Sequence, residues 1–226
     1  MLAFFKQIFK LANNQDEDNI VLLCSSGIDS IAASHYFLTT FRSRYRISLL
    51  HFNHNLRDQN NTMAASFEAF AKTTAVPYTI KHLECDNSTE GACRRARLEY
   101  LETYSNTTFI TAHHLDDCVE SYLLNCIRGK EGFLPIPFHT ILENSNNVSI
   151  NRPFLFSRKR DFSEYVTENN LLQYVVEDET NTQTKGSRRN LLRNKIIPLL
   201  EEEAVGLSTI VKKKMLKRLS SFAEDL

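Results

Sequence analysis

The chain has 226 residues, 42% of them hydrophobic and 24% charged, which is ordinary for a globular protein with one well-cored domain and a small appendage. Lys and Arg together number 27, and so do Asp and Glu, so the net charge gives no sign of a nucleic-acid partner. A local basic patch would have to hold such a partner. The five Cys include no C-x-x-C pair, which argues against a disulfide framework, a zinc ribbon or an iron–sulfur site and favours a reducing, cytoplasmic setting.

No apolar run approaches the roughly 20 residues that a membrane-spanning helix needs, so no membrane partner is expected. Residues 1–11 place apolar side chains on one helical face and carry two Lys, which predicts an N-terminal docking helix. The alternative is a transit peptide, which is normally richer in Arg and Ser. The expected location is the cytoplasm, or an organelle stroma or matrix if the protein is organelle-encoded.

Short apolar runs alternate with helix-compatible segments up to residue 128. Strands are predicted at 20–24, 47–53, 77–82 and 108–112, and helices at 30–41, 62–73, 91–104 and 116–128. This βαβα alternation is typical of an α/β fold, in which a mostly parallel sheet has helices on both faces and binds ligands at the carboxyl ends of its strands.

The alternation stops at a loop with Gly and Pro at 129–140. Two weak strands are expected within 141–155, followed by a helix that Ser157 caps and that runs to residue 169. A polar loop at 177–186 precedes a final helical region, which is expected to kink or restart at Pro198.

A small polar loop, Ser25-Ser-Gly-Ile-Asp-Ser30, lies between the first predicted strand and the first predicted helix. The backbone N–H groups of such a loop and the positive end of the next helix attract anions, so the loop can hold a phosphate. It contains no Lys and therefore differs from the Lys-bearing nucleoside-triphosphate loop. Asp29 stands where a phosphate would lie, which fits a bridging Mg²⁺ ion. The alternative is an ordinary turn in which Asp29 and Ser30 cap the helix.

Two adjacent His and two adjacent Asp follow the fourth predicted strand: His113, His114, Asp116 and Asp117, with Glu120 one turn later. The alternative to a ligand site is that the carboxylates only cap the helix, but the set exceeds what a cap needs. Carboxylates suit Mg²⁺, and imidazole suits hydrogen bonding or proton transfer. Zinc is disfavoured because the two His are adjacent and no thiolate is suitably spaced.

Further polar residues end the second strand and line the third helix. Asn53, His54 and Arg57 are interpreted as ligand contacts at a strand end. Arg94 and Arg97 share a helix face, where they suit phosphate or base contacts or, as the alternative, surface salt bridges.

A basic cluster opens the final helical region. Arg189 and Arg193 lie four residues apart on one helix face, and Arg188 stands beside them. Phosphate contacts from such a cluster supply affinity for RNA, whereas the alternative is a solvated basic helix start. The Lys run at 212–214 is interpreted as a solvated helix face, with a nucleic-acid patch as its alternative.

Together these motifs resemble those of the tRNA(Ile)-lysidine synthases, a family of the PP-loop ATP pyrophosphatase group. The matches follow the family's order and cover roughly residues 20–200: Ser25-Ser-Gly-Ile-Asp-Ser30, Asn53-His-Asn-Leu-Arg57, Arg94-Arg-Ala-Arg97, Ala112-His-His-Leu-Asp-Asp117 with Glu120 and Arg128-Gly129, Arg152-Pro153, and Arg189-Asn-Leu-Leu-Arg193. The HHxDD block and the late RNxxR element are the most specific of these.

The sequence departs from the family pattern in two ways. Ser26 stands at the family's first loop glycine, and we expect a serine to be tolerated there with a negative φ. The resemblance also implies a short form without the C-terminal tRNA-gripping domains of longer members. The chain is then divided into a PP-loop nucleotide-binding core at 1–135 and a small, mostly helical extension at 136–226, whose basic helix contacts tRNA.

The resemblance implies a ligase that uses ATP and Mg²⁺ to join free L-lysine to C2 of the wobble cytidine in tRNA(Ile), through an adenylated tRNA intermediate. The alternatives are a tRNA thiolase of the same group, which the unpaired Cys disfavour, and a tRNA- or nucleotide-binding module without catalysis. The oligomeric state is left open, a homodimer included.

The resemblance also implies roles for single residues, although it leaves open which His and which Asp does which task. The implied catalytic residues are Asp29, Asp116, Asp117, His113, His114, Arg94 and Arg97. The implied ATP-binding residues are Ser25, Ser26, Gly27, Ile28, Asp29, Ser30, Asn53 and His54. Mg²⁺ is assigned to Asp29 and Asp117, and tRNA to Arg128, Arg188, Arg189 and Arg193.

Overall fold

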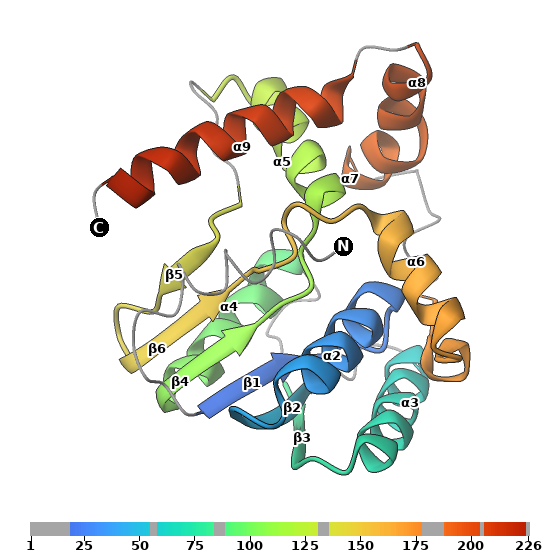
Figure 1. The fold of residues 1–226 in the computed structure, drawn as a ribbon, viewed down its shortest axis with the longest axis vertical. Coiled ribbons are helices and arrows are strands. Elements are labelled where there is room, and N and C mark those ends of the chain that lie inside the picture. Colours follow the sequence, from blue (N-terminus) through green and yellow to red (C-terminus); the bar gives the residue numbers. More distant parts are fainter. Residues whose placement is uncertain are drawn as a thin grey trace.

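The computed structural model describes residues 19–54, 58–83, 89–130, 136–177, 188–203 and 206–224 (Figure 1). The predicted helix at 1–11 and Arg57 lie outside these residues, as does most of the polar loop predicted at 177–186.

A six-stranded sheet with the order β3-β2-β1-β4-β6-β5 forms the centre of the molecule. Its strands are β1 (Asn19–Leu23), β2 (Arg46–Asn53), β3 (Tyr78–His82), β4 (Ser105–Ile110), β5 (His139–Ile141) and β6 (Asn146–Asn151). Neighbouring strands run parallel, except that the short β5 pairs antiparallel with β6 at one edge. The predicted mostly parallel sheet is confirmed.

Helices follow most of the strands, as the alternation predicted. They are α2 (Ile28–Phe41), α3 (Asp58–Thr74), α4 (Glu90–Glu102), α5 (Leu115–Ile127), α6 (Lys159–Glu168), α7 (Arg188–Leu191), α8 (Ile197–Glu202) and α9 (Leu207–Glu224). A π-helical turn at Leu192–Ile196 precedes α8, in whose first turn Pro198 lies. Because proline lacks an N–H and its ring crowds the preceding turn, the helix widens there and then restarts, as predicted.

The two faces of the sheet bury separate apolar clusters. In β1, Leu22 faces the cluster that contains Phe37 of α2 and Phe67 of α3. Its neighbour Val21 faces the opposite cluster, with Leu101 of α4, because successive strand residues point to opposite faces. The helices on both faces therefore have the apolar surfaces that hold them there, and the predicted fold class is confirmed.

The segment predicted as a C-terminal extension contributes both β5 and β6 to the main sheet, so β6 lies directly beside β4. The division of the chain at residue 135 stays a prediction. The helical part of that segment packs elsewhere, since Val211 and Met215 of α9 are buried against Leu115 and Val119 of α5. Figure 1 shows α9 lying across α5, beyond the sheet.

Open α/β sheets bind ligands in a crevice at the point where the strand order reverses, which here lies between β1 and β4. From β1 the chain continues to β2 and β3 on one side, whereas beyond β4 it continues to β6 and β5 on the other side. Such a reversal of direction leaves space for a ligand at the carboxyl ends of the two central strands. The loop after β1 and the His–Asp block after β4 both begin at this edge.

We predict that α9 depends on its buried face for its attachment. Met215 is fully buried, so Met215→Ala should lower the free energy of unfolding by about 2–5 kcal/mol, as buried Met truncations do. Ile210→Ala on the same helix, at a side chain that is 41% exposed, should cost less than about 1 kcal/mol. Urea unfolding followed by circular dichroism measures both, and equal losses would contradict the packing of α9 on α5.

Candidate active site

Ser30 organises the polar loop between β1 and α2. Its hydroxyl donates to the carbonyl oxygen of Gly27 (2.9 Å) and accepts from the N–H of Ser25 (3.1 Å). Gly27 is the N-cap of α2, and no side chain caps the helix there. The N–H groups of the first turn of α2 are therefore left to face an anion, as a phosphate-binding loop requires.

Ser26 adopts a left-handed backbone with a φ of 63°, so the expected negative φ is wrong. Two hydrogen bonds hold this conformation. The hydroxyl of Ser26 donates to the carbonyl oxygen of Met63 in α3 (2.8 Å), and its own carbonyl oxygen accepts from the N–H of Val176 (2.9 Å). The side chain is fully buried, so a contact outside the loop offsets the strain that a glycine would avoid.

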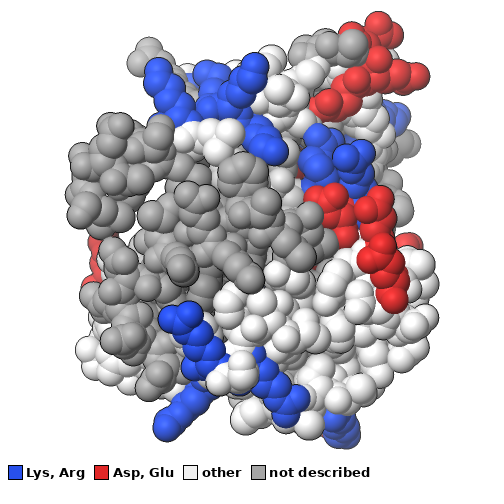
Figure 2. All heavy atoms as spheres, viewed as in Figure 1, with Lys and Arg blue, Asp and Glu red and all other residues white. Residues whose placement is uncertain are grey.

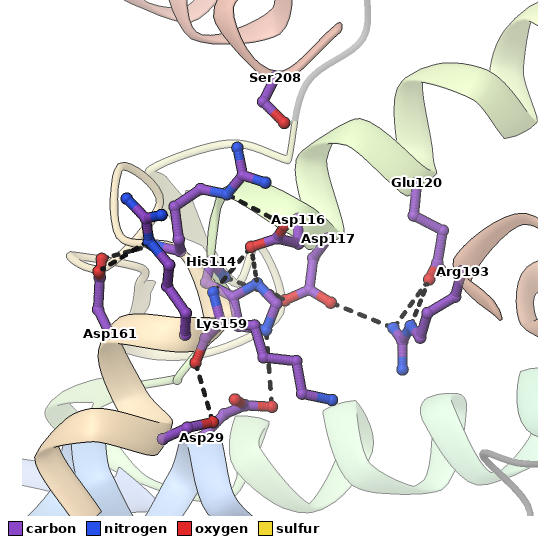
Figure 3. Close-up of polar contacts among 12 residues, drawn as sticks. Asp29, His114, Asp116, Asp117, Glu120, Lys159, Asp161, Arg193 and Ser208 are labelled. Carbon is purple, nitrogen blue, oxygen red and sulfur yellow. Dashed lines mark hydrogen bonds and ion pairs between the residues drawn. The ribbon is translucent and has the colours of Figure 1, made fainter. Parts of the chain in front are cut away.

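The imidazole of His114 joins the loop to α5 (Figure 3). Its Nε2 lies 3.5 Å from Oδ2 of Asp29, and its Nδ1 lies 3.5 Å from Oδ2 of Asp117 and 3.7 Å from Oδ2 of Asp116. Burial lowers the pKa of His114, but the hydrogen bond with Asp29 and the charges of the three carboxylates together raise it above its ordinary value. The site thus favours an imidazolium among carboxylates.

Asp29 carries one buried carboxylate oxygen, Oδ1, that has no hydrogen-bond partner in the described part of the chain. Asp29 lies in the first turn of α2, beside the uncapped N–H groups. A bound phosphate with its cation would supply the missing partner, so these residues fit the predicted ATP and Mg²⁺.

The predicted metal pair Asp29 and Asp117 lies on opposite sides of the His114 ring, at Nε2 and Nδ1. Among the described residues, no three His, Cys, Asp or Glu side chains form a group that could hold a metal ion. The assignment of Mg²⁺ to this pair stays a prediction.

Asp116 binds the start of α6 rather than the centre of the crevice. Its Oδ2 accepts from the N–H of Lys159 (2.8 Å), and its Oδ1 lies 3.2 Å from Nε of Arg158. This carboxylate therefore caps a helix that follows β6, as well as neighbouring His114.

Asp117, Glu120 and two arginines form the second half of the site. Glu120 is buried; its Oε1 lies 3.1 Å from Nε of Arg189, and its Oε2 accepts from Nε of Arg193 (2.9 Å). Arg193 also lies 3.3 Å from Oδ1 of Asp117. Burial raises the pKa of Glu120, and the two guanidinium groups oppose that shift. Arg189 and Arg193 thus form ion pairs with α5, and their contact with tRNA stays a prediction.

His113 lies beside His114 in sequence, and its Nδ1 is 2.7 Å from the hydroxyl of Thr111. The side chain is exposed, but the surrounding protein and the nearby cations of Arg152 and Arg94 lower its pKa, against the opposing charge of Asp117. At neutral pH this imidazole is therefore uncharged, and its pKa is shifted in the opposite direction to that of His114.

The remaining predicted ligand residues lie around this edge of the sheet. The amide of Asn53 donates to Oδ1 of Asn61 (3.4 Å) and is buried. Burial lowers the pKa of the neighbouring His54, and the charge of Arg97 lowers it further. The charges of Arg97 and Arg94, both on α4, thus act on His54 after β2 and on His113 after β4.

Two predicted tRNA-binding residues lie away from the crevice. Arg128 follows the last residue of α5, and a 13-residue helix separates it by about 20 Å from His114 at the other end. Arg188 is exposed in the first turn of α7.

Sequence reasoning assigned no role to Glu120, Arg152, Arg158 or Lys159. Glu120 and Arg152 lie in motifs that resemble those of the lysidine synthases, and this position is the sequence signal that could have identified them as functional. Arg158 and Lys159 had no such signal, because their contacts with Asp116 span more than 40 residues of sequence.

The fold and this edge define a PP-loop protein. Residues 2–200 match the family model described as the PP-loop domain, and the chain belongs to that family. Within it, the sequence is 31% identical over 188 residues to a tRNA(Ile)-lysidine synthase of Haemophilus ducreyi and 30% identical over 197 residues to one of Staphylococcus aureus. These matches cover 81% and 82% of this chain but only 42% and 45% of the relatives, so the chain spans less than half their length. The resemblance inferred from the motifs is confirmed.

Solved structures share the fold at low identity. The U34-tRNA thiolase NcsA from Methanococcus maripaludis superposes with a TM-score of 0.70 at 13% identity, over 96% of this chain and 78% of that one. The NMN synthetase from Francisella tularensis gives 0.55 at 11%, over 93% and 92%. No helix among the described residues is long and apolar enough to span a membrane.

We predict that the hydroxyl of Ser26 contributes to the free energy of unfolding. Ser26→Ala keeps the left-handed strain but loses the bond to Met63, so it should lower the free energy of unfolding by about 0.5–1.5 kcal/mol. Ser26→Gly loses the same bond but also the strain, so it should be more stable than the alanine variant by about 1 kcal/mol. Urea unfolding tests the order, and an alanine variant at least as stable as the glycine variant would contradict it.

We also predict energetic coupling between Glu120 and Arg193. A double-mutant cycle of Glu120→Gln and Arg193→Met should give a coupling of about 1–3 kcal/mol in unfolding, because the carboxylate is buried. The exposed pair of Glu68 and Lys72 on α3, 2.9 Å apart, is the matched control and should couple much more weakly. Equal coupling in both pairs would show that the Glu120 cluster adds nothing beyond a surface ion pair.

Proposed function

We propose that this protein is an ATP-dependent ligase that joins lysine to C2 of the wobble cytidine of tRNA(Ile), through an adenylated tRNA intermediate. The single observation that carries the proposal is the uncapped first turn of α2, with a buried and unpartnered Asp29 oxygen, next to the His–Asp block of α5. The similarity to tRNA(Ile)-lysidine synthases supports this choice of substrate.

In the first step, the C2 carbonyl oxygen of the cytidine attacks the α-phosphate of ATP and pyrophosphate leaves. The N–H groups of Gly27 to Ser30 and the positive end of α2 suit the leaving phosphates. Asp29 would hold Mg²⁺, which neutralises phosphate charge when it is bound. Arg94 and Arg97 reach the same edge from α4 and would stabilise negative charge on the α-phosphate or orient the base.

In the second step, the ε-amine of lysine attacks C2 and AMP leaves. The ammonium must first lose a proton, and the two imidazoles suit different tasks. His113, whose pKa is lowered, would face the amine as an uncharged hydrogen-bond acceptor, whereas His114, whose pKa is raised, lies between Asp29 and Asp117 and positions them. Asp117 would orient the ammonium or complete the metal site, and Asp116 shares that environment.

A basic surface on α9 fits the RNA partner. Lys213, Lys214 and Lys217 are exposed, while Val211 and Met215 on the opposite face are buried. Figure 2 shows Lys and Arg atoms gathered along the upper edge, where Figure 1 places α9, and acidic atoms towards α8. Because the net charge is zero, this local gathering supplies the phosphate contacts that overall charge does not. Exposed Arg188 and half-exposed Arg189 would extend it from α7.

The thiolase alternative has weaker support. Cys24 and Cys118 are buried, and burial raises the pKa of both thiols, that of Cys118 to about 12. Protonated, buried thiols are poor nucleophiles and poor cluster ligands. Cys24 and Cys118 therefore do not favour sulfur chemistry.

The decisive experiment incubates the protein with labelled lysine, ATP with Mg²⁺ and unmodified tRNA(Ile), and then analyses the nucleosides. Wild type should release pyrophosphate only with tRNA and should incorporate lysine. Asp29→Asn should reduce pyrophosphate release on the order of 100-fold or more, because its neutral amide cannot hold the cation at the phosphates.

Glu168→Gln, at an exposed carboxylate of α6, is the control and should keep wild-type activity with the same circular dichroism spectrum. Binding of ATP or tRNA without pyrophosphate release by wild type would instead identify a non-catalytic module. Near-normal turnover by Asp29→Asn would overturn the assignment of this residue.

A further inference from the structure

Arg152, at the end of β6, carries a buried positive charge that the chain leaves incompletely paired. Its side chain is about nine-tenths buried. Among the described residues, its guanidinium bonds through one nitrogen, Nη1, which donates to the carbonyl oxygen of Pro137 (2.9 Å) and to the hydroxyl of Thr140 (2.8 Å). The Nε atom is buried and has no partner within the described residues. Buried polar atoms without partners are rare enough to point to an absent ligand.

The sheet places Arg152 next to the site. Its neighbour Asn151 pairs with Ile110 at the end of β4, and the N–H of Thr111 donates to the carbonyl oxygen of Asn151 (3.1 Å). The hydroxyl of Thr111 in turn contacts His113. Arg152 therefore lies one strand away from the His–Asp block, at the same carboxyl edge.

A second cation, Arg94 on α4, lies near enough for its charge to act on Arg152. This helix starts at the carboxyl edge because it follows β3, and it packs on β6. Burial and the charge of Arg94 lower the pKa of Arg152 to about 10. No ion pair joins Arg152 to a carboxylate in the described part of the chain, so two cations are brought together without an acidic residue between them. Such an arrangement is costly unless an anion occupies it.

The shape of the remaining donors selects the kind of anion. Because Nη1 donates to Pro137 and Thr140, the opposite edge of the guanidinium, which contains Nε, remains for a ligand. Carboxylates bind to such an edge through two parallel hydrogen bonds. The deep burial of Arg152 admits a small anion more readily than the backbone of a folded RNA. We propose that Arg152 and Arg94 form a subsite for the α-carboxylate of the amino-acid substrate.

This subsite deepens the proposed function and rests on it. A lysine held by its carboxylate at the end of β6 extends its four-carbon stem toward the imidazoles and carboxylates that follow β4. The ε-amine is thereby directed at the centre where the nucleotide and the base would meet. The subsite also lets the protein discriminate lysine from amines that lack a carboxylate.

The test compares lysine with cadaverine, which is lysine without its carboxylate, as the attacking amine. Arg152→Met should raise KM for lysine on the order of 10–100-fold and leave KM for cadaverine within about twofold, because only lysine loses a charge-assisted contact. Arg152→Lys should restore part of the preference for lysine. Thr140→Val removes one structural partner of Arg152 and should keep the wild-type ratio of the two KM values.

An equal rise of both KM values in Arg152→Met would overturn the subsite and leave Arg152 with a structural role. An unchanged amine ratio with weaker tRNA binding in a filter assay would also overturn it, in favour of an RNA phosphate. Should Arg152→Met fail to fold, Arg152→Gln, whose amide can still donate to Pro137 and Thr140, carries the same expectation for the two KM values. The absence of pyrophosphate release by wild type with tRNA would refute the proposed ligase rather than the subsite. In that case, calorimetric titration of lysine and cadaverine still tests the subsite.

Discussion

Three carboxylates share one buried imidazole at the centre of this molecule, and the rest of the site is arranged around that constraint. Asp29 comes from the first turn of α2, and Asp116 and Asp117 come from the first turn of α5. Acidic side chains favour helix N-termini, so each helix would tolerate its own carboxylates. Bringing the two helices together concentrates negative charge, and the raised pKa of His114 shows how the fold offsets it.

The segment between β6 and α9 supplies positive charges that offset a further buried carboxylate, Glu120. Glu120 would be a costly buried carboxylate without Arg189 and Arg193, which come from the segment between β6 and α9. This ion-pair cluster attaches that segment to α5 through polar contacts, whereas α9 attaches to α5 through apolar ones. The site and the C-terminal helices are therefore held by one helix, α5.

Much of the fold and part of the site were predictable from the sequence. Alternating apolar runs gave the parallel strands, and strand ends placed Asp29 and His114 at one edge before any contact was known. The short edge strand β5 has too few residues for a pattern, so its position could not be predicted. The capping of α6 by Asp116 and the pairing of Glu120 with Arg193 join distant segments, and no local periodicity encodes them. The left-handed φ of Ser26 depends on where α3 packs, which residue types alone do not reveal.

The bond from Val176 to Ser26 gives the turn after β1 a partner in the stretch that follows α6, far along the sequence. The same stretch is fixed to α3 by Ser66, whose hydroxyl donates to the carbonyl oxygen of Tyr174 (2.8 Å), and by Gln59, whose amide donates to that of Glu177. Opening the turn would therefore require the stretch to lift away from α3 at the same time. In hydrogen–deuterium exchange, the amides of both segments would belong to one cooperative unit, and their protection would rise together when the crevice is filled.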